Sequence, residues 1–298
     1  MSEYNQTKLM QDVVDAFAGT PEPRLRQLMT ALVKHIHAYA REVDLTPNEW
    51  LAGLKFLTAT GQISHEKRPE FILLSDTLGL SMMVVALAQA RASGTVQGAT
   101  EATEATVEGP FYWPGAPDVP LGADIAEGVP GEPAFYMGRV TDTNGKPLAG
   151  ALLDVWSGDG DGKYDMQLSP NPTMRARGRL RTDAEGRYWF WSIYPTCYPI
   201  PDDGPVGDMM RATGRSIYRP GHIHMMISAE GHVPLTTHLF VAGSPYIDQD
   251  AVFGKRDSLV VEFDKHAPGK AVDGREMKVP YYSASYDFRL APTPKANP

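Results

Sequence analysis

The composition of this chain changes near residue 100, and the change limits the folds that are open to it. Before that point, apolar residues such as Leu9, Val13 and Phe17 recur at helical spacing. Beyond it, proline and glycine become frequent, and short β-rich runs lie between turn signals. We therefore expect an α+β protein with a helical N-terminal domain at residues 1–105 and a β-sandwich domain at residues 106–298, with the small polar run at 98–106 as a linker.

Local signals divide the first part into four helices, the first of which ends near Gly19. A second helix is expected from about Pro23 to Val43. The run Thr46-Pro47-Asn48-Glu49 is typical of a helix start, with threonine as N-cap, proline at the first position and glutamate at the third. A fourth helix is expected from about Glu70 to Ala92.

The second part is predicted to be an antiparallel β-sandwich or barrel. Strong turn signals such as Asn144-Gly145 separate its short strands. The strands are expected at FYMGRV (135–140), ALLDVW (151–156), YWFWSIY (188–194), HIHMMIS (222–228), THLFVAG (237–243), SLVVEF (258–263) and VPYYSASYDF (279–288).

Charge and composition exclude several classes of protein. With 36 acidic and 28 basic residues the net charge is −8, which argues against a nucleic-acid partner. Cys197 is the only cysteine, so an internal disulfide and a cysteine-rich zinc site are both excluded. The start of the sequence has no secretory signal pattern, and the apolar segment near residues 78–90 is too short and mixed to span a membrane. We expect a cytoplasmic protein.

A metal site is suggested by His222 and His224, because side chains two apart on a strand point to the same face. Cupins also use such a pair, but their pattern needs a glycine where this chain has Ser216 and a glutamate where it has Ser228 and Ala229. No carboxylate has a supporting spacing, so the remaining ligands are expected to be other oxygen donors.

Tyrosine is the most abundant candidate for those donors. A phenol has a pKa of about 10 and ionises near neutrality only beside a strong Lewis acid such as Fe(III). Two phenolates and two imidazoles would leave ferric iron with a single positive charge. Spacing alone does not choose two tyrosines among Tyr164, Tyr188, Tyr194, Tyr198 and Tyr218.

Calcium is a weaker alternative. Asp159 and Asp161 fit the first two ligand positions of an EF-hand loop, but Lys163 and Pro170 occupy positions where that loop needs ligands. A polar loop after the strand that ends at Trp156 explains the run better.

Long motifs in a fixed order give a specific resemblance. The chain resembles the intradiol ring-cleavage dioxygenases, in the group of catechol and hydroxyquinol 1,2-dioxygenases (EC 1.13.11). The motifs that carry it are TVEGPFYWPGAP (106–117), GKPLAGALLDVWSGDGDGKYD (145–165), LRTDAEGRYWFWSIYPTCYPIPDDGPVG (180–207), YRPGHIHM (218–225) and DAVFGKRDSLV (250–260).

The resemblance implies a β-sandwich that carries one Fe(III) per subunit, with O2 and a catecholic molecule as substrates. It assigns the iron ligands to Tyr164, Tyr198, His222 and His224. Tyr198 would leave the metal when substrate binds and accept a proton, and Arg219 would stabilise negative charge on the ring. The implied product is a cis,cis-muconate-type diacid, or maleylacetate from hydroxyquinol.

The resemblance also implies a substrate pocket. The runs FILLSDTLGLSMMV (71–84) and DAVFG, together with His238, resemble the hydroxyquinol enzymes, whereas Glu108 resembles the catechol enzymes. Val85 stands where the hydroxyquinol pattern is expected to have an aspartate, so catechol and substituted catechols stay open as substrates. The pocket residues are Met82, Val85, Gly109, Pro110, Phe111, Ile200, Pro201, Arg219 and Val252.

A homodimer through the N-terminal helices, with bound phospholipid, is a further implication; Val13, Phe17, Leu28 and Leu32 would supply apolar faces. A different class stays open as well. The strands around GKPLAGALLDVW also resemble non-catalytic modules of the transthyretin type, which need neither the tyrosines nor the histidine pair.

Overall fold

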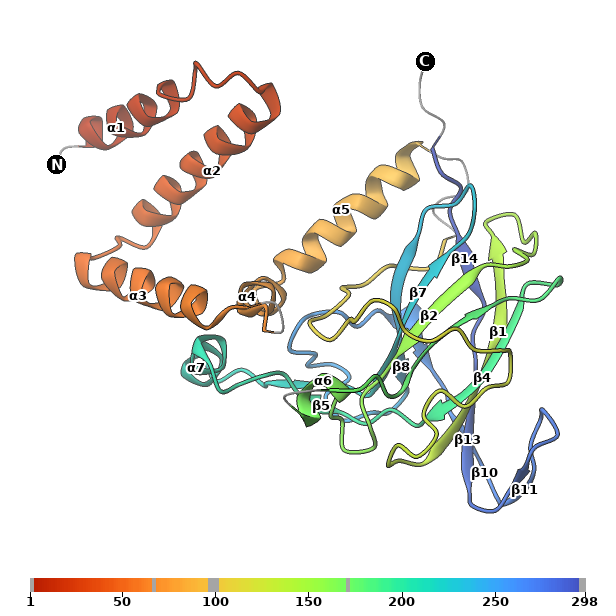
Figure 1. The fold of residues 1–298 in the computed structure, drawn as a ribbon. Coiled ribbons are helices and arrows are strands. Elements are labelled where there is room, and N and C mark those ends of the chain that lie inside the picture. Colours follow the sequence, from red (N-terminus) through yellow and green to blue (C-terminus); the bar gives the residue numbers. More distant parts are fainter. Residues whose placement is uncertain (1–2, 66–67, 96–101, 170–171, 295–298) are drawn as a thin grey trace. The chain divides into compact units, whose positions relative to one another are not determined.

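The computed structural model of the chain describes residues 3–65, 68–95, 102–169 and 172–294 (Figure 1). The chain divides into two compact units, Met1–Ala59 and Thr60–Pro298. The boundary expected between residues 105 and 106 separates helical structure from β-structure and does not coincide with this division. It stays a prediction. Of the expected linker, residues 98–101 lie outside the described residues, whereas 102–106 are held to the β-structure: the Thr103 amide donates to the Arg289 carbonyl at 3.0 Å.

The first unit contains the helices α1 (Glu3–Asp15) and α2 (Pro23–Glu42) and most of α3 (Pro47–Ile63). The predicted start of α3 is confirmed. The Thr46 amide donates to the Glu49 carboxylate at 2.9 Å, and the Glu49 amide donates to the Thr46 hydroxyl at 3.3 Å. This reciprocal capping satisfies two amides that the helix itself leaves unpaired.

The single helix expected from Glu70 to Ala92 is wrong. Two helices, α4 (Glu70–Thr77) and α5 (Leu80–Thr95), replace it. Gly79 lies between them with φ of +74°, a left-handed conformation that ends a helix and that glycine adopts without strain. Among the described residues no single helix is long and apolar enough to cross a membrane; Glu70–Thr77 and Leu80–Arg91 meet that test only together, and they are bent by 73°.

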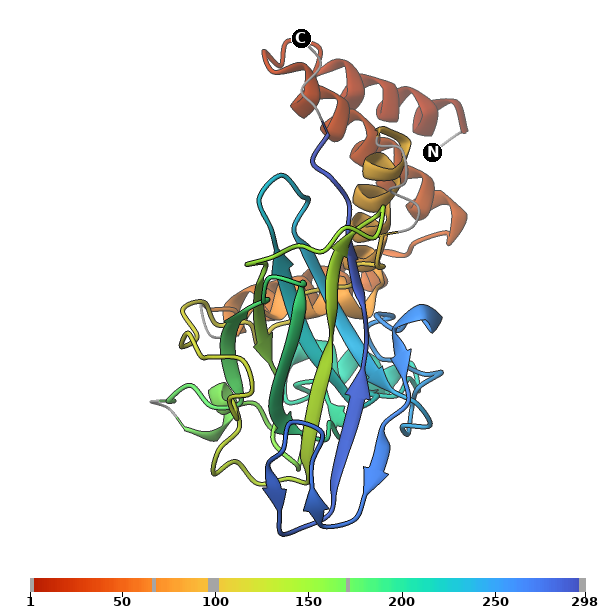
Figure 2. The same cartoon turned by 90° about the vertical axis from the view of Figure 1, so that its right-hand side faces the viewer.

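Two five-stranded sheets form most of the β-structure described in the second unit, beside two two-stranded ones (Figure 2). In one, β1 is central; β4 pairs with one of its edges, and β13 and β14 pair with the other, with β10 beyond β13. The other has the order β3-β2-β7-β8-β9. The bounds are β1 (Pro133–Asp142), β2 (Leu152–Trp156), β3 (Arg177–Arg181), β4 (Arg187–Ile193), β7 (His222–Ser228), β8 (Leu235–Val241), β9 (Val260–Val261), β10 (Asp264–His266), β13 (Tyr281–Ser285) and β14 (Phe288–Leu290).

The sheets are mixed, which corrects the expectation of a purely antiparallel sandwich. β1 runs parallel to both β13 and β14, and β8 runs parallel to β9. Parallel neighbours need long connections, and the whole of the second sheet lies in the chain between β1 and β13.

Alternation along β7 determines what each face of its sheet carries. Ile223, Met225 and Ile227 are fully buried in the main hydrophobic core. His222 and His224 point to the opposite face, as the spacing predicts. The remaining elements are short: α6 (Asp165–Leu168), β5 (Tyr198–Pro199), α7 (Pro205–Ala212), β6 (Tyr218–Arg219) and the 3₁₀ helix η2 (Asp257–Leu259). β5 pairs with β6, and β11 (Gly269–Lys270) and β12 (Glu276–Met277) form a separate ribbon.

Candidate metal centre

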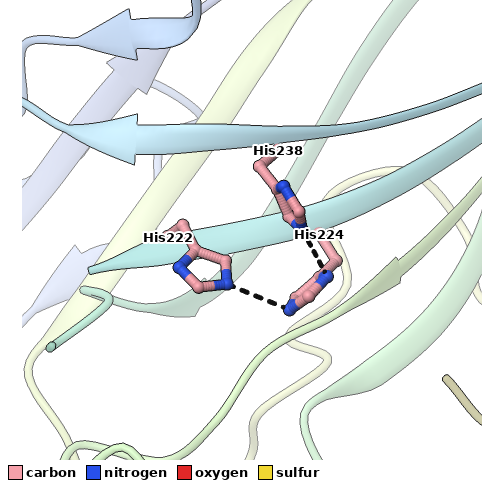
Figure 3. Close-up of side chains that lie close together, drawn as sticks. All are labelled: His222, His224 and His238. Atoms are coloured by element: carbon pink, nitrogen blue, oxygen red, sulfur yellow. Dashed lines mark hydrogen bonds between the residues drawn. The ribbon is translucent and has the colours of Figure 1, made fainter. Parts of the chain in front are cut away.

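Four buried donor atoms converge beside β7. The Tyr164 hydroxyl lies 2.7 Å from His224 Nε2 and 3.2 Å from the Tyr198 hydroxyl. The Tyr198 hydroxyl lies 3.3 Å from His222 Nε2, and the two Nε2 atoms are 3.2 Å apart. Figure 3 shows the two imidazoles turned toward one another from the same strand. Two phenol oxygens and two imidazole nitrogens therefore surround one point.

Each tyrosine is placed by a short element of its own. Tyr164 is the N-cap of α6, and the next residue, Asp165, forms a buried ion pair with Arg177 of β3 at 2.5 Å. Tyr198 lies on β5, where it is paired in register with Arg219 of β6. Phe111 stacks on the Tyr164 ring with the centroids 4.4 Å apart, which fixes the plane of that ring.

The other three candidate tyrosines point elsewhere. The Tyr188 hydroxyl donates to the Tyr286 carbonyl at 2.8 Å, within the main core. Tyr194 stacks on Tyr282, and Tyr218 stacks on Tyr246. Sequence spacing could not choose between five tyrosines, whereas in the structure two of them reach the histidine pair.

The site favours neutral histidines with their Nε2 lone pairs directed inward. His222 Nδ1 lies 2.7 Å from the Pro220 carbonyl, which can only accept, so Nδ1 carries the proton. Burial, together with the charge of Arg219, lowers the pKa of His222 to about 3. Burial also holds the pKa of His224 well below its ordinary value and raises the pKa of both Tyr164 and Tyr198. Phenolate at these tyrosines therefore requires a bound cation.

Arg219 is a buried cation at the edge of this cluster. Its Nη1 lies 3.0 Å from His222 Nε2 and 3.5 Å from the Tyr198 hydroxyl. Its Nε and Nη2 face the Asp250 carboxylate at 3.0 and 3.3 Å. Burial acts most strongly and would lower the pKa of Arg219, but the charge and hydrogen bonds of Asp250, together with Tyr198 and Tyr164, outweigh it and the pKa is raised. Arg219 thus carries a permanent charge beside the donor atoms.

Asp250 is a functional residue that the sequence did not reveal. Its carboxylate also accepts the amides of Val252 at 3.3 Å, Gly254 at 2.9 Å and Lys255 at 3.1 Å. The same side chain therefore shapes the loop that follows it and orients Arg219. The DAVFG motif marks the segment, but nothing in the sequence indicates that its aspartate pairs with an arginine of β6.

Comparison with known proteins identifies the family. A family described as "Dioxygenase" matches residues 107–292, and one described as "Catechol dioxygenase N terminus" matches residues 22–95. The chain belongs to the intradiol dioxygenase family.

The relatives cover nearly its whole length. It is 46% identical over 293 residues to a 6-chlorohydroxyquinol 1,2-dioxygenase of Cupriavidus pinatubonensis, covering 98% of this chain and 100% of that protein. A hydroxyquinol 1,2-dioxygenase of Nocardioides simplex is 47% identical over 291 residues, covering 97% of each chain. The crystal structure of a hydroxyquinol 1,2-dioxygenase from Pseudomonas putida superposes with a TM-score of 0.88 at 43% identity, covering 98% of this chain and 100% of that one.

Membership of this family decides between the two classes that the sequence left open, in favour of the enzyme over the transthyretin-type module.

The structure also gives the surroundings of the predicted pocket residues. Gly109 lies beside His224, where an added Cβ would be 3.4 Å from the imidazole Cε1. Val252 is held by Asp250, Met82 and Ile200 are buried, and Pro110 and Pro201 are partly exposed.

Val85 lies away from the four donor atoms. It lines an apolar cavity of about 360 Å³ formed by α5, the segment 102–108, the start of β8 and the end of β14, and none of the four predicted ligands is in that lining. Asp76, at the end of α4, is a second buried carboxyl besides Asp250 that interacts with Arg219. It is 2% exposed, and the charges of both Arg219 and Asp250 act on it. The substrate contact of Val85 stays a prediction.

Proposed function

We propose that the chain uses one ferric ion per subunit, bound by Tyr164, Tyr198, His222 and His224, and O2 to cleave the ring of a catecholic substrate between its two hydroxylated carbons. Both oxygen atoms of O2 enter the product, which is maleylacetate from hydroxyquinol or a cis,cis-muconate-type diacid from a catechol. The single observation that supports this best is the convergence of two phenol oxygens and two imidazole nitrogens at mutual distances of 2.7 to 3.3 Å.

The chemistry of the donor set fits ferric iron. Phenolate is a hard ligand and imidazole a borderline one, and together they suit a trivalent cation better than the sulfur ligands of structural zinc sites. The buried phenols have raised pKa values, so only a strong Lewis acid would ionise both. When bound, ferric iron would supply Lewis acidity toward both oxygens of the substrate and make the aromatic ring reactive toward O2.

Two residues of the chain contribute directly to the reaction. The Tyr198 oxygen, which lies 3.5 Å from Arg219 Nη1, would accept one of the two protons that a catechol loses on binding. The guanidinium of Arg219 is buried and fixed, and it would stabilise negative charge that develops on the substrate.

Hydroxyquinol is the proposed substrate. Asp76 is a buried carboxyl within the electrostatic reach of Arg219, and it could accept a hydrogen bond from a third ring hydroxyl. A catechol lacks that hydroxyl and would leave the carboxyl without a substrate partner. The relatives named above support the same choice, because they are named for hydroxyquinol and chlorohydroxyquinol.

Metal analysis of the purified protein tests the centre. Tyrosinate-to-iron(III) charge transfer absorbs visible light, so the iron-loaded protein should be reddish and hold about one iron per subunit. A colourless protein that takes up no iron on reconstitution would contradict the proposal.

We also propose a homodimer through the N-terminal helices. Along α2, apolar side chains recur every three or four residues and are about half exposed: Leu25, Leu28, Leu32, Ile36, Tyr39 and Val43. A second copy would cover this stripe, and a phospholipid would fit beside it. Sedimentation analysis of a Leu28→Glu/Leu32→Glu variant would give a monomer if this is right, and mass spectrometry of a solvent extract would detect the lipid. A cytoplasmic location stays a prediction.

A further inference from the structure

We infer that His238 and Thr106 are positioning residues that hold His224 in the tautomer its metal-binding nitrogen requires, and that His238 is not itself a ligand. The inference rests on the proposed metal centre. It concerns a group of three buried histidines, His222, His224 and His238, whose nitrogens lie close enough together to hold a metal by themselves.

Sheet register places these residues in a row. His224 of β7 lies opposite Trp156 of β2 on one side and opposite His238 of β8 on the other. The Trp156 ring stacks on the His224 imidazole with the centroids 4.7 Å apart and the planes at 17°. His238 meets the same imidazole nearly edge to face, at 73°. His224 is therefore held on both sides by neighbours that pairing across the sheet brings there.

The hydrogen bonds form a chain from Thr106 to the metal centre. The Thr106 hydroxyl lies 2.6 Å from His238 Nδ1, and His238 Nε2 lies 2.8 Å from His224 Nδ1. For His224 Nε2 to bind a metal, its Nδ1 must carry the proton and donate it to His238 Nε2. His238 must then be protonated on Nδ1, and this N–H donates to the Thr106 oxygen. The arrangement satisfies every ring nitrogen in the row.

The same geometry argues against His238 as a ligand. Its Nε2 approaches Nδ1 of His224, whereas the Nε2 atom of His224 faces His222 (Figure 3). The same Nε2 atom also faces the Tyr164 hydroxyl. Both nitrogens of His238 already have partners within the protein. A three-histidine site would have to break one of these hydrogen bonds, and a site of two tyrosines and two histidines breaks neither.

Thr106, at the end of this row of hydrogen bonds, is itself held by the backbone of β8. Its amide donates to the Thr236 carbonyl of β8 at 2.9 Å, and the Thr237 hydroxyl donates to the Glu104 carbonyl at 2.8 Å. Thr106 is 2% exposed. The segment before the sandwich is thus fastened to β8 at Glu104 and at Thr106 itself, which holds the Thr106 hydroxyl relative to His238.

The two proposed histidine ligands differ in the partners of their Nδ1 atoms. His222 Nδ1 donates to a backbone carbonyl, which no side-chain substitution removes. His224 also has a backbone partner at Glu108, but its Nδ1 faces the side chain of His238, which Thr106 holds in turn. Substitutions at these two positions should therefore act on one ligand alone, which makes the inference testable without altering a ligand.

The first test compares His238→Gln with His238→Leu. Glutamine offers a carbonyl oxygen near the position of Nε2 that can accept the His224 proton, whereas leucine offers no acceptor. We expect His238→Gln to keep iron affinity and the visible band close to wild type. We expect His238→Leu to lose about 10- to 100-fold in iron affinity, the usual effect of removing such a partner, with a shifted band. Iron affinity is measured by competition with a chelator on the full-length protein.

The second test uses Thr106→Val and Thr106→Ser. Valine should weaken iron binding in the same direction as His238→Leu, and serine should restore it, because serine keeps the hydroxyl. The melting temperature of each iron-free variant controls for folding, and the Thr106 pair gives the answer even if His238→Leu does not fold.

Two results would overturn the inference. If His238→Gln lost iron as completely as His224→Ala, His238 would be a ligand. If His238→Leu and Thr106→Val both bound iron like the wild type, the chain of hydrogen bonds would have no role in positioning. A wild-type protein that binds no iron at all would instead overturn the proposed metal centre, which separates the two failures.

Discussion

The guanidinium of Arg219 and the carboxylate of Asp250 form a two-pronged ion pair that is almost completely buried, with their side chains 2% and 3% exposed. The pair joins β6, which carries Arg219 beside the four donor atoms, to the loop that carries Val252. Because Asp250 also accepts three backbone amides of that loop, one carboxylate fixes both the cation and the loop.

Asp250→Ala should therefore destabilise the protein strongly. Removing one partner of a buried ion pair leaves the other charge uncompensated, at a cost of about 3–5 kcal/mol in the free energy of unfolding. Asp118→Ala is the matched control, since Asp118 pairs with Arg179 at 2.8 Å with its own side chain 73% exposed, and such a pair contributes at most about 1 kcal/mol. Denaturant titration of the iron-free variants measures both. Equal losses in the free energy of unfolding would show that the buried pair contributes no more to stability than the exposed pair does.

Arg219→Met should lose turnover by about 10²- to 10³-fold, the usual effect of removing one preorganised electrostatic group. It should also lower the melting temperature, because Asp250 is left unpaired. The double variant Arg219→Met/Asp250→Asn separates the two roles. Stability should recover in part because both charges are gone, while turnover of the iron-loaded enzyme stays low. Recovery of turnover in the double variant would mean that Arg219 acts only through the fold.

Several of these features could be predicted from the sequence because they depend on local pattern. Five of the seven predicted strands and the capped start of α3 follow from spacing and turn chemistry, as does the shared face of His222 and His224. The run SLVVEF instead holds only the two-residue β9 after a 3₁₀ helix, and VPYYSASYDF is divided between β13 and β14. The ligand tyrosines were named only through family resemblance. Local pattern did not distinguish them, because Tyr164 and Tyr198 approach the histidines from separate short elements.

Features that depend on contacts distant in sequence were missed. The charged run RGRLR did not suggest a strand, yet it forms β3, and its first arginine, Arg177, is buried against Asp165. The partners of Arg219 and His224, which are Asp250 and His238, come from other strands or loops. The break at Gly79 was missed because the apolar pattern continues through it.

Loss of a proposed ligand should remove the colour of the protein. Tyr164→Phe or His224→Ala should lose iron or most of the charge-transfer band. Tyr188→Phe is the matched control, because Tyr188 is equally buried but donates its hydrogen bond to the Tyr286 carbonyl. It should keep colour and turnover and lose about 0.5–1.5 kcal/mol of stability with that bond. A bleached Tyr188→Phe beside a coloured Tyr164→Phe would contradict the ligand assignment.

Asp76 should also make stability depend on pH. Burial raises the pKa of Asp76, so the folded state holds its proton more tightly than the unfolded state does. The contribution of this residue to stability is then fully present below the unfolded pKa of about 3.9 and is lost as the pH rises through the folded pKa. Asp76→Asn should therefore be at least as stable as the wild type at neutral pH, with an advantage that shrinks as the pH falls through the folded pKa and is gone below about pH 4. Denaturant titrations across this range measure the difference, and an advantage that grew toward low pH would contradict it.

Substrate selectivity tests Asp76 against Val85. If the Asp76 carboxylate accepts the third hydroxyl of hydroxyquinol, Asp76→Leu should reduce the kcat/KM ratio of hydroxyquinol to catechol by about 5- to 150-fold, the equivalent of one unsatisfied buried polar group at about 1–3 kcal/mol. The sequence instead predicts that the wild type processes catechol or an apolar-substituted catechol at least as well as hydroxyquinol, and that Val85→Asp shifts the ratio toward hydroxyquinol by the same factor. Competition assays with both substrates on the three proteins decide between them. A wild-type preference for hydroxyquinol that Asp76→Leu abolishes and Val85→Asp leaves unchanged would assign the selectivity to Asp76, because Val85 faces a cavity that contains none of the proposed ligands.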